Sequence, residues 1–372
     1  MANYKINPLD VSFEPLAGST FINIVRLLAQ NNFRISLIGI PRIVYSAGLS
    51  LILSPLSFYE KVKYTKKINN TKIEKPPIFI IGHWRSGTTY MHNLMAQDDS
   101  FVYPTTFQTV APALFLRFEK QIKPIVASSL PPTRPQDHIK LGADLPQEEE
   151  YGVGNLSTHS YYHAWCFPKN RDFYYNCVHF DGVKEKRIKE WKKYYLFYLK
   201  KLALYYKGKQ LILKNPSNTG RVKQLLELFP DAKFIHIYRN PYHTFLSKKR
   251  NIEKEMTLYC IQKPDDEETF EKAMAEMYNK MYDKYFNDKK LIPKENLVEI
   301  KYENLVKDPY NVVKKLYQDL NIPTFKNCET NLKKYIKTQL NVKTYKYSID
   351  KQTHEKIYNY LNKPIDKWGY SK

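Results

Sequence analysis

Apolar and polar residues along the chain first form an informative pattern between residues 76 and 95. The four apolar residues Ile78–Ile81 predict a short buried strand, which ends at Gly82. A helix is predicted next, capped by Thr88 or Thr89, because the following apolar residues share one face: Tyr90, Met91, Leu94 and Met95. A strand, a glycine loop and a helix N-terminus direct unpaired N–H groups and the helix dipole at one place. The pattern therefore predicts an anion site.

Alternating strands and helices recur further along the chain. Strands are predicted at Leu211–Leu213, Phe234–Tyr238 and Asn296–Ile300, and helices at Asn218–Phe229 and Pro309–Leu320. Strands that alternate with helices pair in parallel, with ligand groups at their carboxyl ends. The predicted fold class is α/β, with a doubly wound, mostly parallel sheet of P-loop NTPase-like type flanked by helices.

Two helices are predicted before the first strand. Ser19–Gln30 has the pattern of an amphipathic helix. The next segment, Ile35–Ser57, is more apolar, but Pro41 and Arg42 are expected to break it, and the remaining run Ile43–Leu53 is too short to span a bilayer. We therefore expect an interfacial or lid helix. It either packs on the domain alone or also contacts a membrane or a hydrophobic substrate.

The composition indicates a folded globular protein but is compatible with several functions. A chain of 372 residues with 43% hydrophobic residues can build a core, and it contains no repeat. We expect a helical extension over residues 1–70 and one domain over residues 71–372. The formal net charge of +22 suits a nucleic acid, an anionic membrane or a polyanionic ligand. A solvated lysine-rich surface is the plainer explanation.

The cysteines and the N-terminus indicate a cytoplasmic protein. The four cysteines lie far apart without a CxxC pair, so neither a zinc site nor a disulfide framework is expected. The opening residues MANYKINPLD lack the basic region and apolar run of a secretory signal. Peripheral membrane contact through residues 19–57 remains open.

The loop after the first strand differs from a Walker A loop at one position. Gly82, Gly87 and Thr89 match its glycines and its Ser/Thr, but Thr88 replaces its lysine. The cation is Arg85, inside the loop, where a planar guanidinium can bind an oxyanion through two hydrogen bonds. This arrangement argues against an ordinary ATPase. A glycine turn without a ligand would show the same pattern.

A second stretch carries a resemblance to a known family. In FPDAKFIHIYRNPYHTFLSKKR, from Phe229 to Arg250, Arg239 follows a predicted strand and Ser247 lies on the next helix. Together with GHWRSGTTY at residues 82–90, it resembles the sulfotransferases that use 3′-phosphoadenosine 5′-phosphosulfate (PAPS), particularly their bacterial branch. Two further segments match in order: LILKNPSNTGRV (Leu211–Val222) and LVEIKYENLVKDP (Leu297–Pro309). The resemblance extends from the first strand to the C-terminus.

The resemblance implies a role for each matching residue. In the family the first loop holds the 5′-phosphosulfate, which here implies a cradle of Arg85, Ser86, Gly87, Thr88 and Thr89. Tyr90 would stack on the adenine, and Arg239 and Ser247 would bind the 3′-phosphate. Lys214 would act catalytically with Arg85, near the bridging oxygen where charge develops. The implied co-substrate is PAPS, its product is 3′-phosphoadenosine 5′-phosphate (PAP), and no metal is implied.

The chain departs from the family at the catalytic base. Cytosolic relatives have a histidine two residues after the lysine, where this chain has Pro216. In bacterial relatives an acidic run similar to PQEEE lies beside the reactive sulfur, which makes Glu148 the candidate base and Glu149 its nearest substitute. Alternatively, these acids and Glu150 only stabilise a helix dipole. Three histidines also stay open as bases: His83, His159 and His163.

Apolar and aromatic segments outside the matching motifs indicate the class of acceptor. The Pro-rich and aromatic segment Phe101–Pro135 and the apolar N-terminus favour a hydrophobic alcohol, such as a sterol or another lipid, over a glycan or a phenol. We expect in-line transfer of a sulfuryl group to its hydroxyl, with no nucleic-acid partner. In the family a late basic segment covers the nucleotide, a role that Lys343 and Lys346 would have here; the alternative is a solvated run of charged residues. The rivals are a P-loop kinase or NTPase and a non-enzymatic basic protein that binds nucleic acid or membrane.

Overall fold

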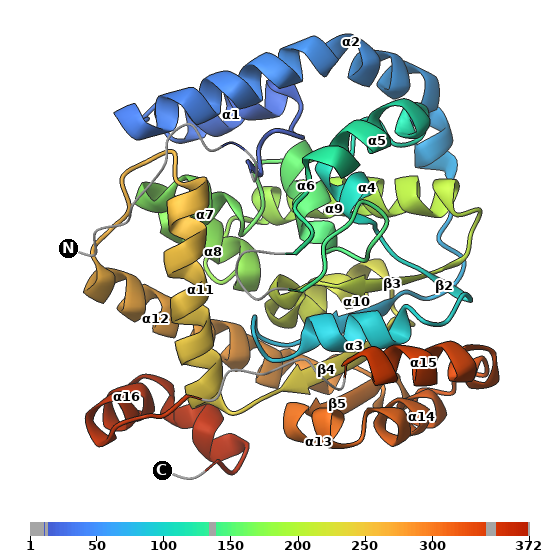
Figure 1. Ribbon diagram of the computed structural model, residues 1–372, viewed down its shortest axis with the longest axis vertical. Coiled ribbons are helices and arrows are strands. Elements are labelled where there is room, and N and C mark those ends of the chain that lie inside the picture. Colours follow the sequence, from blue (N-terminus) through green and yellow to red (C-terminus); the bar gives the residue numbers. More distant parts are fainter. Residues whose placement is uncertain (1–10, 12–13, 134–138, 340–346, 371–372) are drawn as a thin grey trace. The chain divides into compact units, whose positions relative to one another are not determined.

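A computed structural model describes residue 11 and residues 14–133, 139–339 and 347–370, with residues 254–257 described by their backbone alone (Figure 1). The chain divides into two units, each made of three segments. The first unit comprises Met1–Glu74, Pro104–Gly208 and Asn251–Glu267, and the second comprises Lys75–Tyr103, Lys209–Arg250 and Glu268–Lys372. The expected division at residue 70 concerns segments of sequence rather than these units, and it stays a prediction.

A five-stranded sheet organises the second unit. Its strands are β1 (Ile78–Ile81), β2 (Phe101–Val102), β3 (Gln210–Lys214), β4 (Lys233–Tyr238) and β5 (Leu297–Lys301). They lie in the order β2-β3-β1-β4-β5, and every pairing is parallel. The register pairs Ile80 with Lys214 and Ile81 with His236, so the carboxyl ends of the three central strands lie together. The predicted fold class is confirmed.

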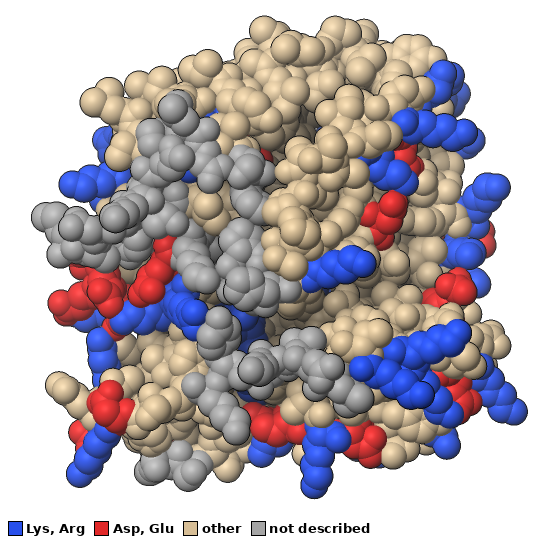
Figure 2. Space-filling view, in the orientation of Figure 1, with Lys and Arg blue, Asp and Glu red and all other residues tan. Residues whose placement is uncertain are grey.

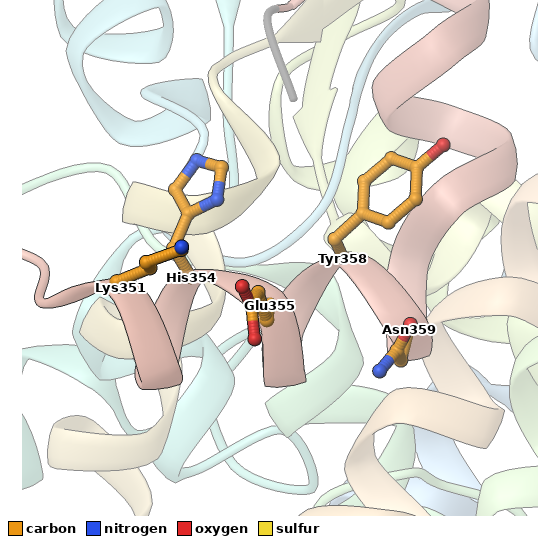
Figure 3. A pocket seen from close by; sticks show the side chains of 5 residues that line it. All are labelled: Lys351, His354, Glu355, Tyr358 and Asn359. Carbon is orange, nitrogen blue, oxygen red and sulfur yellow. The ribbon is translucent and has the colours of Figure 1, made fainter.

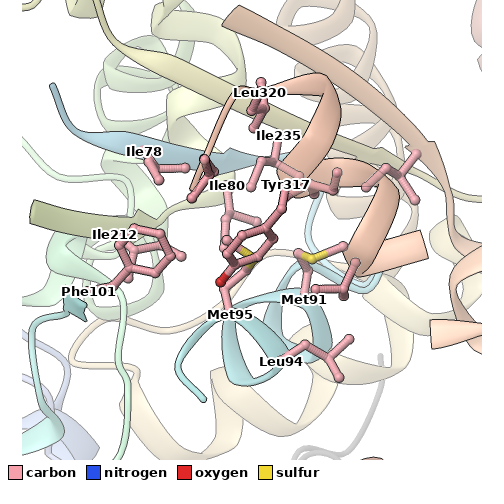
Figure 4. Close-up of a cluster of buried hydrophobic side chains, with 14 of the residues drawn as sticks. Ile78, Ile80, Met91, Leu94, Met95, Phe101, Ile212, Ile235, Tyr317 and Leu320 are labelled. Carbon is pink, nitrogen blue, oxygen red and sulfur yellow. The ribbon is translucent and has the colours of Figure 1, made fainter. Parts of the chain in front are cut away.

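Helices cover the sheet because its central strands are apolar on both faces. On one face, α3 (Thr88–Met95), α14 (Pro309–Asp319) and α15 (Phe325–Gln339) contribute to a buried cluster with residues of β1, β3 and β4 (Figure 4). On the opposite face, the ring of Phe79 packs against the rings of Phe229 and Phe234. This double cover explains why all four residues of β1 are buried.

The other elements of the second unit connect and extend this core. They are η3 (Pro216–Arg221), α10 (Val222–Leu228), α12 (Glu267–Asp288), η4 (Lys289–Leu291), η5 (Lys294–Asn296), α13 (Tyr302–Lys307) and α16 (Lys351–Lys367). Helix α11 (Pro241–Tyr259) begins in the second unit and ends in the first. The single helix predicted from Asn218 is in fact the tight helix η3 followed by α10, since Asn215 accepts a hydrogen bond from the Ser217 N–H and Pro216 opens η3.

The first unit is built from helices. They are α1 (Phe21–Gln30), η1 (Leu37–Gly39), α2 (Ile40–Asn70), α4 (Thr106–Val110), α5 (Glu119–Ser129), α6 (Glu149–Leu156), α7 (His163–Cys166), η2 (Pro168–Asn170), α8 (Arg171–His179) and α9 (Glu185–Tyr205). Aromatic side chains of α9 are part of the core, where the ring of Trp191 stacks on that of Tyr195 at 4.8 Å. The four cysteines of the chain are buried.

Helix α2 is longer than its sequence pattern predicts. Pro41 does not break it, because proline at the first positions of a helix removes an N–H that needs no partner there. The helix continues through Pro55 to Asn70 and has 31 residues, about 46 Å at 1.5 Å per residue. The prediction that this segment is too short to span a bilayer is therefore wrong. By length and composition alone the helix could cross a membrane, a test that some core helices of soluble proteins also pass.

Candidate functional site

The loop between β1 and α3 has the backbone of an anion-binding nest. Gly82, Arg85 and Gly87 all have positive φ, at 142°, 73° and 104°. A side chain is excluded at both glycines, because a Cβ would lie 2.2 Å from the Ile237 carbonyl oxygen at Gly82 and 2.3 Å from the ring of Tyr302 at Gly87. Gly87 itself precedes the helix, so the predicted caps are wrong. Thr88 and Thr89 lie in the first turn, where N–H groups lack partners within the helix.

Two residues that sequence reasoning missed anchor this loop. The hydroxyl of Thr219 accepts a hydrogen bond from the Gly82 N–H at 2.7 Å and donates one to the Gly82 carbonyl at 3.1 Å. The hydroxyl of Tyr282 accepts from the His83 N–H at 3.1 Å. Among the described residues, the buried Ser86 hydroxyl has no hydrogen-bond partner. The loop therefore has a fixed backbone and an unsatisfied hydroxyl.

Three of the predicted site residues are joined by hydrogen bonds. Arg85 donates through Nε to the hydroxyl of Ser247 at 3.0 Å. Arg239 donates through Nη1 to the Arg85 carbonyl at 3.2 Å. The glycine loop and the segment after β4 are thus brought together within the second unit, and two guanidinium groups lie at the carboxyl ends of β1 and β4.

Residues after β5 support Arg239. Its guanidinium lies 4.4 Å from the centre of the Tyr302 ring, a cation–π contact. The neighbouring Glu303 accepts hydrogen bonds from the Asn240 N–H at 3.3 Å and from the Tyr370 hydroxyl at 2.9 Å. Tyr302 and Glu303 belong to the KYENL part of the fourth matching segment, so the sequence marked this region but not its contact with Arg239.

Lys214 and Tyr90 lie on the elements that flank the loop. Lys214 ends β3 and is buried, and the next residue, Asn215, donates its N–H to the Ile80 carbonyl at 3.2 Å. Burial, together with the nearby Lys214 charge, lowers the pKa of His92 well below its usual value. Tyr90 lies in the first turn of α3 and is half-buried, and burial raises the pKa of its hydroxyl to about 12.

The three candidate histidines sit in contacts that keep them neutral. Burial and the charge of Lys248 lower the pKa of His83 to about 3, and its ring packs 4.3 Å from that of Tyr278. In the first unit, burial lowers the pKa of both His159 and His163 to about 4. His163 contacts the Gly154 carbonyl at 3.1 Å through Nε2. These environments favour structural roles.

The three glutamates of the acidic run have different surroundings in the first unit. Glu148 precedes α6, is 7% exposed and accepts a hydrogen bond from the Tyr162 hydroxyl. Glu149 and Glu150 are fully buried. Glu149 accepts from the Tyr195 hydroxyl at 2.8 Å, and Glu150 accepts from the Tyr161 N–H at 3.0 Å. Of the three, only Glu148 keeps any contact with solvent.

A separate hollow in the second unit does not involve these residues. It has a volume of about 540 Å³, and the described residues that line it all belong to α16: Lys351, His354, Glu355, Tyr358 and Asn359 (Figure 3). The ring of His354 stacks on that of Tyr242 at 4.0 Å, so this lining side chain already has a partner within the protein. Lys343 and Lys346, expected to cover a nucleotide, lie outside the described residues.

The segments that form this site match a known protein family. A model described as the Sulfotransferase family matches residues 76–327. The chain belongs to this family. The match begins just before β1 and includes the loop, Lys214, Arg239 and Ser247. The predicted family resemblance is confirmed, and membership favours a sulfotransferase enzyme over both a kinase and a non-enzymatic basic protein.

Relatives and solved structures agree with this identification. Two proteins 30% identical to this sulfotransferase are the omega-hydroxy-beta-dihydromenaquinone-9 sulfotransferases Stf3 of Mycobacterium bovis and Mycobacterium tuberculosis. Each alignment spans 355 residues, 95% of this chain and 91% of the relative. Sulfotransferase STF9 from Mycobacterium avium has a similar fold, with a TM-score of 0.69 at 17% identity over 92% of this chain and 89% of that one. STF1 from Mycobacterium tuberculosis H37Rv gives 0.64 at 16% identity over 85% and 86%.

Proposed function

We propose that this sulfotransferase takes its sulfuryl group from PAPS and transfers it to the hydroxyl of a hydrophobic alcohol. The observation that carries the proposal is the chain of contacts from Ser247 through Arg85 to Arg239. It puts two guanidinium groups next to the start of α3. Such a pair suits a ligand with two separate anionic groups, because each guanidinium can bind one through charge-assisted hydrogen bonds.

The residues of the loop fit a phosphosulfate group. The buried Ser86 hydroxyl has no partner among the described residues, and Gly87, packed against the ring of Tyr302, supplies the positive φ of the nest. Ser86, Thr88 and Thr89 would bind the 5′-phosphosulfate through hydroxyl and N–H groups. Tyr90 would stack on the adenine, and Arg239 and Ser247 would bind the 3′-phosphate.

The chemistry assigns one task to each remaining residue. When bound, PAPS supplies an activated sulfuryl group, whose sulfur bonds to the acceptor oxygen while its bond to the bridging oxygen breaks and that electron pair stays on PAP. Lys214 and Arg85 would stabilise the charge that develops on the bridging and equatorial oxygens, without a metal. Glu148 would accept the hydroxyl proton.

A lipid alcohol is the proposed acceptor. The Stf3 relatives are named for a hydroxylated menaquinone derivative, and they align with 95% of this chain. Exposed apolar residues on α1 and α2 also suit a lipid. Residues 1–70 would then serve acceptor delivery and residues 71–372 the transfer reaction. The enzyme would be cytoplasmic, with peripheral membrane contact through residues 19–57 and no nucleic-acid partner.

A comparison of ligands tests the nucleotide assignment. Ligand binding to the folded state raises the melting temperature by mass action, so PAP should raise it at concentrations where AMP and ATP do not. Equal shifts from all three ligands would contradict the assignment. Transfer of labelled sulfate from PAPS to a hydroxylated polyprenyl quinone, compared with a sterol and a sugar, then tests the acceptor. Transfer to the sugar alone would exclude a lipid alcohol.

A further inference from the structure

Helix α2 has the reverse of the polarity expected for a helix in water. Helix α2 contacts α1 and α9, and four of its six buried side chains are polar: Arg42, Ser46, Ser50 and Glu60, beside the apolar Ile43 and Ile68. The opposite face exposes apolar side chains at intervals of four or seven residues: Ile40, Val44, Leu51, Phe58 and Val62. Ile52, beside this row, is 75% exposed. A helix on the surface of a soluble domain normally places its apolar stripe inward.

Specific contacts fix the polar face to the first unit. Arg42 forms an ion pair with the buried Glu14 at 3.6 Å. Glu60 forms a buried ion pair with Lys201 of α9. The Ser50 hydroxyl donates to the Ser19 carbonyl at 2.6 Å. The orientation of α2 therefore follows from paired polar groups, and its apolar face has to be the outer one.

The exposed apolar face continues onto neighbouring segments. Residues 43–59 contain no charged side chain. Helix α1 adds Ile22 and Val25, and Leu37 precedes α2. Figure 2 shows uncharged side chains over the part of the surface where Figure 1 places α1 and α2. Contiguous exposed apolar surface of this kind marks an interaction site.

Cations gather where the apolar face ends. Lys61, Lys63, Lys66 and Lys67 are exposed along the last turns of α2. Beside them is a hollow of about 520 Å³, whose charged lining residues are Lys63, Arg117, Lys120 and Glu119. Glu119 is already paired with Lys123 at 3.1 Å. A hollow with three cations and one paired acid, next to an apolar row, suits a phosphate group attached to hydrocarbon chains.

We propose that α1 and α2 form a lipid-binding face, and that its partner is an anionic bilayer. The helix lies in the plane of the interface with Val44, Leu51 and Phe58 among the acyl chains. Lys63, Arg117 and Lys120 bind lipid phosphates, since apolar burial and attraction to anionic lipids add for an interfacial helix.

The buried ion pairs distinguish this arrangement from a membrane span. Although α2 is long enough to cross a bilayer, crossing would separate Arg42 and Glu60 from their partners and place both charges in hydrocarbon. In the interface the same contacts are preserved. The inference rests on the proposed lipid acceptor only in that such an acceptor would be reached from this surface, because lipid binding itself requires neither PAPS nor acceptor.

Vesicle binding by the full chain tests the apolar face. We expect cosedimentation with vesicles of phosphatidylglycerol and phosphatidylcholine, and at least a tenfold loss of partitioning in the double variant Leu51→Gln/Phe58→Gln. Leu291→Gln, which changes an exposed apolar residue of η4, is the matched control and should bind like the parent. Unchanged partitioning of the double variant would overturn the proposal. So would a parent dimer that the double variant abolishes, because the face would then join two copies of the chain.

Charge reversal tests the cationic hollow. Lys63→Glu/Lys120→Glu should lower binding to the anionic vesicles several-fold, and added salt should weaken binding by the parent. Equal binding of the parent to pure phosphatidylcholine vesicles would refute an anionic partner. The shift in melting temperature caused by PAP is measured on every variant. If it persists while vesicle binding is absent, the lipid face alone is wrong, and if it is absent in the parent, the nucleotide assignment is wrong.

Discussion

Arg85 donates its Nε–H to the hydroxyl of Ser247 over 3.0 Å, across a sequence separation of 162 residues. Arg85 also has a φ of 73°, a left-handed conformation that is uncommon for a residue with a side chain. Two hydrogen bonds stabilise this conformation: the one that Arg85 donates to Ser247, and the one that the Arg85 carbonyl accepts from Arg239. Because such a conformation costs about 1–3 kcal/mol and is common at ligand sites, we expect these contacts to keep the loop in its binding conformation before a ligand arrives.

The first prediction concerns recognition of the 3′-phosphate. Losing a charge-assisted hydrogen bond typically costs about 1.5–3 kcal/mol, so Arg239→Ala should weaken PAP binding roughly ten- to a hundredfold in calorimetric titrations. Adenosine 5′-phosphosulfate lacks the 3′-phosphate and should bind almost unchanged. Arg26→Ala removes a guanidinium from an exposed site on α1 and serves as the control. An equal loss of affinity for both ligands would make Arg239 a residue of the fold instead.

The second prediction separates two costs of a side chain at Gly87. Gly87→Ala brings a strained φ and a Cβ 2.3 Å from Tyr302, the residue that supports Arg239. Gly182 also has positive φ, but a Cβ there would meet nothing within 4 Å. By chemical denaturation, Gly182→Ala should lose about 1 kcal/mol, and Gly87→Ala at least twice that.

Ligand binding extends the same comparison. Gly87→Ala should also weaken PAP binding more than tenfold, because a shift of the Tyr302 ring moves Arg239, which lies over that ring. Gly182→Ala should bind PAP normally. Similar losses of stability in the two variants would show that Tyr302 yields to the added methyl group at little cost.

The third prediction is a pH dependence of stability that comes from Glu149. Burial raises its pKa from 4.5 to about 7, so between those pH values the folded state binds a proton that the unfolded state releases. The free energy of unfolding therefore falls as pH rises through this window, by about 3 kcal/mol for this group. Glu149→Gln mimics the protonated form and should lack this decrease.

The free energies of unfolding of the parent and Glu149→Gln are compared because other groups titrate in the same pH range. The buried His159 and His163, with pKa values of about 4, oppose the effect, since their stabilisation is lost as pH falls. The difference in free energy of unfolding between Glu149→Gln and the parent should grow in favour of the variant from pH 4.5 to 7. A constant difference across that range would show that Glu149 titrates normally.

Much of the fold could be predicted from local patterns of apolar residues. The run Ile78–Ile81 was predicted as a strand with the bounds that β1 has, and Phe234–Tyr238 differs from β4 by one residue. Buried parallel strands are apolar on both faces, so they are visible in sequence. The error at Pro41 has an equally local cause, because the same residue interrupts a helix in its interior and opens it at its start.

Contacts between distant segments could not be predicted in the same way. Thr219 and Tyr282 hold the Gly82 loop from 137 and 199 residues away, and neither follows from periodicity. The polarity of α2 was also hidden, because the burial of Glu60 depends on its pairing with Lys201. Such pairings are set by tertiary packing, whereas propensity and pattern report only local preferences.

The last prediction concerns the base. An alcohol is too weak an acid to lose its proton unaided near neutral pH, so a side chain has to accept it during attack. The histidines are poor candidates because burial lowers their pKa values to about 3 or 4. Among the glutamates, Glu149 and Glu150 are fully buried, which leaves Glu148 as the one with some exposure. We therefore expect Glu148→Gln to lower kcat about a hundredfold or more with unchanged PAP affinity.

A matched variant distinguishes chemistry from structure at this position. Tyr162→Phe removes only the hydroxyl that donates to Glu148. If Glu148 is the base, this variant keeps the carboxylate and should retain most of the activity that Glu148→Gln loses. Near-normal turnover by Glu148→Gln would assign the role elsewhere. In that case Glu149→Gln, which the stability measurements already require, is the next variant to assay, followed by His159→Gln.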